Sequence, residues 1–136
     1  MIPELQVIGN ININTIGMHY YSFEKLNVWQ ISRVFASTIY KVTEGFPENE
    51  KFGMVSQLRR ASISICSNIA EGNSRFSPRD RSRFFEIAYS STMEVLNQLI
   101  ISSDLNWINQ TTLDNFRTRI NEITNKLNAL IKNNSK

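Results

Sequence analysis

Apolar residues recur along most of this chain at steps of three and four residues, and the first such stripe runs through Val28, Ile31, Phe35, Ile39 and Val42. This spacing is typical of one buried face of an α-helix. Three later segments show the same spacing, and no alternating strand pattern competes with it. The pattern therefore predicts four helices, at about residues 25–44, 50–71, 78–104 and 112–132.

Turn and capping residues predict where these helices begin and end. Gly45, Phe46 and Pro47 end the first helix, and Gly72 is the expected C-cap of the second. Ser77-Pro78-Arg79-Asp80 has a hydroxyl for the N-cap and proline at the first helical position, so it predicts the start of the third helix. Either Thr111 or Thr112 is expected to cap the fourth.

Four amphipathic helices joined by short connections predict an all-α fold, an antiparallel up-down-up-down four-helix bundle over residues 23–133. Residues 1–22 show no helical stripe and are expected to form a flexible N-terminal arm, within which Met18 is a possible natural start. The fourth helix carries a heptad seam that needs a partner surface along its whole length. The pattern leaves open whether that surface lies in the same chain or in a neighbouring subunit.

The second helix is rich in small residues, which would allow neighbouring helices to approach closely: Ser56, Ser62, Ser64, Cys66, Ser67 and Ala70. We expect the serines to serve packing and bonding to the helix backbone rather than catalysis. Cys66 is the single cysteine, which indicates a buried structural thiol and a reducing, cytoplasmic compartment. No segment approaches the roughly 20 apolar residues that a membrane-spanning helix requires.

The net charge of +3 is unevenly distributed along the chain. Residues 1–50 carry −2, residues 51–83 carry +5, and residues 84–136 carry 0. Four arginines crowd the predicted turn and the start of the third helix, and we call them the arginine cluster: Arg75, Arg79, Arg81 and Arg83. Positive charge at a helix N-terminus opposes the helix dipole, so the cluster predicts an anionic partner.

Two further arginines, Arg59 and Arg60, lie several turns earlier and predict a separate basic patch. The alternative to an anionic partner is that Asp80 pairs with Arg83, and Arg83 with Glu86, at the surface. Only Phe76 and the Phe84–Phe85 pair could stack on bases, and we expect core packing to take the pair.

The sequence offers little for catalysis or metal binding. The only histidine, His19, lies in the expected arm, which removes Glu-x-x-His metal motifs and a histidine-activated nucleophile from the bundle. Glu71 and Glu94 stand where either could be partly buried, and we interpret them as structural rather than catalytic. We therefore expect no enzymatic activity, no metal and no cofactor.

Several motifs resemble one known family. They are Phe23-Glu24-Lys25-Leu26 with Val28-Trp29, then Phe46-Pro47, Gly53, Gln57-Leu58-Arg59-Arg60-Ala61, Ser67-Asn68-Ile69-Ala70-Glu71-Gly72, residues 84–88 and Glu94. Through these motifs, over about residues 23–108, the chain resembles the four-helix bundle proteins encoded in intervening sequences of 23S ribosomal RNA genes. It departs from their pattern in its long N-terminal segment and in Cys66, where proline is common.

The resemblance implies a ring-like homopentamer without known enzymatic activity, in which Asn68, Glu71, Gly72 and Glu94 belong to the structural motif. The family is also similar to the accessory variability determinant proteins of diversity-generating retroelements, pentamers that bind nucleic acid and a reverse transcriptase. The leading hypothesis is thus a non-enzymatic scaffold that binds structured RNA or DNA through six arginines, Arg59, Arg60 and the arginine cluster. The alternative hypothesis is a protein-interaction adaptor ring without direct nucleic-acid contact.

Overall fold

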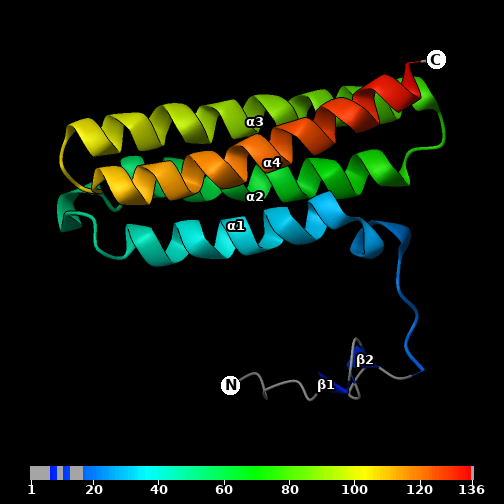
Figure 1. Ribbon diagram of the computed structural model, residues 1–136, viewed down its shortest axis with the longest axis horizontal. Helices are drawn as coiled ribbons and strands as arrows, with labels where there is room; N and C mark the ends of the chain where they lie inside the picture. Colours follow the sequence, from blue (N-terminus) through cyan, green and yellow to red (C-terminus); the bar gives the residue numbers. More distant parts are fainter. Residues whose placement is uncertain (1–6, 9–10, 13–16, 136) are drawn as a thin grey trace.

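Four long helices make up the body of the protein. The computed structural model describes residues 7–8, 11–12 and 17–135. The helices are α1 (Asn27–Thr43), α2 (Met54–Ser74), α3 (Pro78–Asp104) and α4 (Gln110–Asn134). Figure 1 shows them side by side, with the connections between consecutive helices at alternate ends of the bundle. The prediction of an all-α, four-helix fold is confirmed.

A small strand pair and two 3-10 helices accompany the bundle. Strands β1 (Val7–Ile8) and β2 (Ile11–Asn12) pair antiparallel. The 3-10 helices are η2 (Ser22–Lys25), before α1, and η3 (Glu48–Glu50), in the α1–α2 connection. Most of the expected arm, residues 1–6, 9–10 and 13–16, lies outside the described residues, so its flexibility stays a prediction.

Side-chain caps mark the starts of α3 and α4. Ser77 Oγ accepts a hydrogen bond from the Asp80 backbone N–H at 3.1 Å with Pro78 in the first turn, which confirms the predicted start of α3. The predicted cap of α4 is wrong: Asn109 Oδ1 accepts from the Thr112 N–H at 2.8 Å, because asparagine caps as well as threonine and stands before both threonines. α2 begins at Met54, whose N–H donates to Glu50 Oε2 at 3.0 Å.

The core lies between all four helices. Its fully buried large apolar side chains come from every helix and are Ile39, Leu58, Ile65, Ile69, Phe85, Val95, Leu99, Ile123 and Leu127. α2 packs against both α1 and α3, and its interface with α3 is the most extensive. No helix in the described part of the chain is long and apolar enough to cross a membrane.

The small side chains of α2 support this packing, as expected. Ser62 Oγ donates to the Arg59 carbonyl at 2.9 Å, and Ser64 Oγ lies 2.9 Å from Ser91 Oγ on α3. Cys66 is half-buried, and this burial raises the pKa of its thiol to about 11. The thiol therefore stays protonated at neutral pH, which fits a structural role.

Gly72 does not cap α2 as the sequence predicted. The helix continues to Ser74, and Gly72 is buried inside it. A Cβ atom at position 72 would lie 2.9 Å from Phe85 Cε1 and 3.0 Å from Phe84 Cβ. Glycine stands here because α3 approaches the α2 backbone too closely for any side chain, not because the helix ends.

We expect Gly72→Ala to lower the free energy of unfolding by about 1 kcal/mol. Overpacking costs about 1–3 kcal/mol, and the better helix propensity of alanine offsets up to about 1 kcal/mol of it. Urea denaturation measures the difference. Gly45→Ala is the matched control, because a Cβ there would lie 3.7 Å from the Val42 carbonyl oxygen, an ordinary contact. A Gly72→Ala protein more stable than the wild type by about 1 kcal/mol, the full gain in helix propensity, would contradict the close approach.

Candidate nucleic-acid interface

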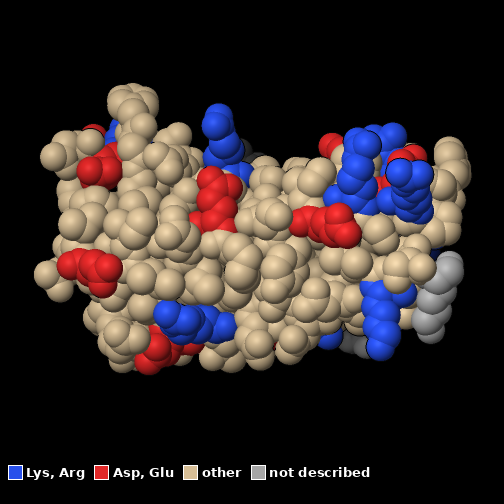
Figure 2. Space-filling model, turned by 90° about the horizontal axis from the view of Figure 1, so that it is seen from above, with Lys and Arg blue, Asp and Glu red and all other residues tan. Residues whose placement is uncertain are grey.

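The arginine cluster lies where α2 ends and α3 begins, so that one helical hairpin carries all four side chains. Figure 2 shows Lys and Arg side chains gathered near this end of the bundle. Arg79 and Arg83 border a hollow of about 680 Å³ between the start of α3 and the end of α4. Its other lining includes Pro78, Ser82 and Asn134, together with the acidic Asp80 and Glu86.

Three contacts hold the cluster together. Arg81 Nε donates to the Arg75 carbonyl oxygen at 2.7 Å, which ties the first turn of α3 to the end of α2. The guanidinium groups of Arg75 and Arg83 lie 4.5 Å and 5.7 Å from the centre of the Phe84 ring. Cation–π contact with a shared ring therefore positions two of the four charges.

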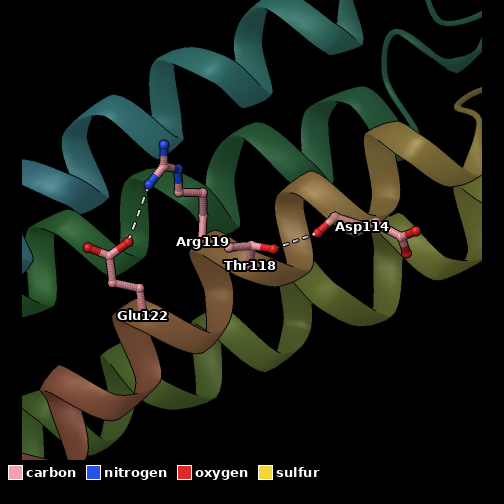
Figure 3. Close-up of polar contacts among 4 residues, drawn as sticks. All are labelled: Asp114, Thr118, Arg119 and Glu122. Atoms are coloured by element: carbon pink, nitrogen blue, oxygen red, sulfur yellow. Dashed lines mark hydrogen bonds and ion pairs between the residues drawn. The ribbon is translucent and has the colours of Figure 1, made fainter.

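In the described part of the chain, no acidic side chain forms a close ion pair with the cluster, although Asp80 and Glu86 line the same hollow. Within residues 17–135, the only ion pair closer than 4.0 Å joins Arg119 and Glu122 on α4, at 3.3 Å (Figure 3). The alternative prediction, that Asp80 and Glu86 pair with Arg83, is therefore wrong, since Arg83 packs over Phe84 instead. The positive charges at the start of α3 are left for solvent or for a partner.

Arg59 and Arg60 are not part of this group. They lie 15 or more residues before Arg75 on the same helix, about 22 Å along its axis. Arg59 donates from Nε to Thr43 Oγ1 at 3.0 Å and from an Nη to the Tyr40 carbonyl at 3.2 Å. These bonds fasten α2 to the C-terminal turn of α1, whereas Arg60 is exposed.

The residues of the SNIAEG segment divide into packing and surface positions. Asn68 donates its amide to the Ser64 carbonyl at 2.8 Å and to Ser64 Oγ at 3.0 Å, so both bonds lie within α2, and Ser64 Oγ in turn contacts Ser91 of α3. Glu71 is exposed. Glu94 is exposed too, although its carboxylate accepts from Gln98 Nε2 at 3.3 Å. The expectation that either acid is partly buried is wrong, because both stand on the outer side of their helices.

Of two further surface features, the sequence reasoning named the first and missed the second. Phe76, in the turn inside the arginine cluster, is 99% exposed. A groove of about 980 Å³ also separates α1 from α4, with Ile31, Val34, Phe35 and Phe116 among its lining. The sequence gives no signal for this groove. The spacing of apolar residues predicts which face of α1 is apolar, but it does not show whether another helix packs over all of that face.

The fold and the site together define a class of protein, a four-helix bundle with a basic helical hairpin at one end. The chain belongs to the family described as 23S rRNA-intervening sequence protein, whose model matches residues 24–129. Among solved structures it is similar to a protein of unknown function from the S23 ribosomal protein family of Bacteroides thetaiotaomicron. The two are 27% identical with a TM-score of 0.69, over 77% of this chain and 98% of the other. Among curated proteins no relative matches the chain.

Proposed function

We propose that this protein is a non-enzymatic, homo-oligomeric scaffold that binds nucleic acid, in particular structured RNA, through the arginine cluster. The observation that carries the proposal is the set of four arginines at the N-terminus of α3 without an acidic partner within 4.0 Å among the described residues. Uncompensated charge of this kind at a helix N-terminus opposes folding, and a bound anion removes the conflict.

Phosphate suits this site chemically. The first backbone N–H groups of a helix point outward toward an anion, and arginine guanidinium groups match phosphate oxygens in geometry. The hollow bordered by Arg79 and Arg83 gives a phosphate backbone a place to lie against α3. The family description names a 23S rRNA-intervening sequence and no ligand, so the choice of structured RNA over DNA is part of the proposal.

The proposal includes assembly, as an antiparallel up-down-up-down bundle that forms a ring-like homopentamer in the cytoplasm. The connections at alternate ends of the bundle support the antiparallel order (Figure 1). Several large apolar side chains are exposed on the helices and support subunit contact: Val34, Ile87 and Ile101. Light scattering that gives the mass of five chains would agree with the ring, and the mass of one chain would contradict it.

Filter binding of a radiolabelled RNA hairpin at low salt tests the function directly. We expect saturable binding that weakens steeply as salt is added, because phosphate contacts release counterions. Wild-type protein that retains no RNA on the filter at low salt would end the proposal.

The groove between α1 and α4 favours a second candidate function, a protein-interaction adaptor without direct nucleic-acid contact. Val34 is 62% exposed along it, and the mixed lining, which includes Lys41 and Arg119 as well as apolar side chains, suits the two faces of an amphipathic helix. By the family resemblance, a reverse transcriptase is one such partner. A pull-down that retains its protein partner after nuclease treatment and high salt would favour this function over RNA binding.

A further inference from the structure

Phe76 does not contribute to the packing of the bundle. It lies in the connection between α2 and α3, directly before Ser77, the N-cap of α3, and it is 99% exposed. Full exposure forfeits the stabilisation that burial of a phenylalanine side chain contributes. In the described part of the chain, only Phe52, in the α1–α2 connection, comes close, at 90% exposed.

The surroundings of Phe76 are cationic. Arg75 precedes it directly, and Arg79 and Arg81 follow within five residues. The nearby Phe84 is already covered, because Arg75 and Arg83 lie over its ring. No such aromatic or cationic contact involves Phe76 among the described residues, so its ring is open to a ligand.

We propose that Phe76 stacks on an unpaired base of the bound RNA while the arginine cluster holds the adjacent phosphates. This inference rests on the proposed function and narrows its substrate class. Bases inside a continuous A-form duplex are stacked on each other, and its deep major groove does not admit a side chain. Bases in loops and bulges are accessible to aromatic rings, so the preferred ligand is RNA with unpaired nucleotides.

Two RNAs provide the test: a blunt 20-base-pair duplex, and the same duplex with a three-nucleotide bulge that carries 2-aminopurine. We expect the wild type to bind the bulged RNA more tightly and to quench the 2-aminopurine fluorescence by stacking. Phe76→Ala should weaken binding to the bulged RNA about 10-fold or more, leave duplex binding unchanged and abolish the quenching. Phe76→Trp should retain both the preference and the quenching.

Phe52→Ala is the matched control, since Phe52 is equally accessible beside Lys51 but lies in the connection at the other end of α2. It should bind both RNAs like the wild type. If Phe76→Ala binds the bulged RNA as tightly as the wild type, or weakens both RNAs equally, the stacking inference is overturned while RNA binding stands. If the wild type binds neither RNA, the proposed function and the inference fall together. Capture of a protein through Phe76 with no change in RNA binding would overturn it in favour of a protein contact.

Discussion

Ile65→Ala is expected to lower the free energy of unfolding by about 2–5 kcal/mol, the usual cost of removing a large aliphatic side chain from a packed core. Ile65 is 0% exposed and lies midway along α2, the helix that packs against both α1 and α3. The substitution would leave a cavity in the core. We expect the surrounding side chains to fill little of it, because the long helices on both sides of α2 cannot move closer together. Chemical denaturation followed by circular dichroism measures the loss.

Ile63→Ala is the matched control for this prediction. Ile63 has the same side chain two residues earlier on α2, but it is 46% exposed. Its replacement should cost less than about 1 kcal/mol. Equal losses at the two positions would mean that α2 is not oriented in the bundle as described.

The double substitution Arg79→Glu with Arg83→Glu should weaken binding to structured RNA about 100-fold or more at low salt. Both side chains border the hollow beside α3, and neither has an acidic partner within 4.0 Å among the described residues. Each charge-assisted bond to phosphate is worth about 1.5–3 kcal/mol, and the new carboxylates would also repel the phosphates. Both side chains are exposed, and acidic residues near the N-terminus of α3 suit the helix dipole, so the thermal midpoint should not fall.

A second double variant separates local contact from net charge. Lys51→Glu with Arg117→Glu changes the net charge by the same amount at exposed positions in the α1–α2 connection and on α4. It should retain most of the RNA affinity. Equal losses in the two double variants would show that overall charge, and not the arginine cluster, governs binding.

The regular spacing of apolar residues made the four helices predictable. Some of their boundaries depend on contacts with a neighbouring helix and were not. The Ser77-Pro78 start of α3 is a local signal, because the cap bond closes within the same turn. Gly72 gave the same local signal as a helix end, yet its role is to let Phe84 and Phe85 of α3 approach. A close approach of this kind is a property of two helices together, so one stretch of sequence does not reveal it.

The candidate site was predictable in its location and less so in its contacts. The arginine cluster spans nine consecutive positions around one turn, so charge spacing alone placed it. The expected pairing of Arg83 with neighbouring acids does not occur, because the guanidinium group lies over the Phe84 ring instead. Arg59 is also an arginine in the basic part of the sequence, but its bonds to Thr43 and Tyr40 form because α1 packs beside α2. The sequence alone therefore did not predict them.

The salt dependence of RNA binding tests most directly the central claim, that the arginine cluster contacts RNA phosphates. The slope of log affinity against log salt changes by about 0.7–0.9 for each phosphate contact. The neutral double variant Arg79→Ala with Arg83→Ala should therefore show a slope shallower than that of the wild type by about 1.5. An identical slope in the two proteins would mean that these arginines do not touch the phosphates, and it would contradict the account.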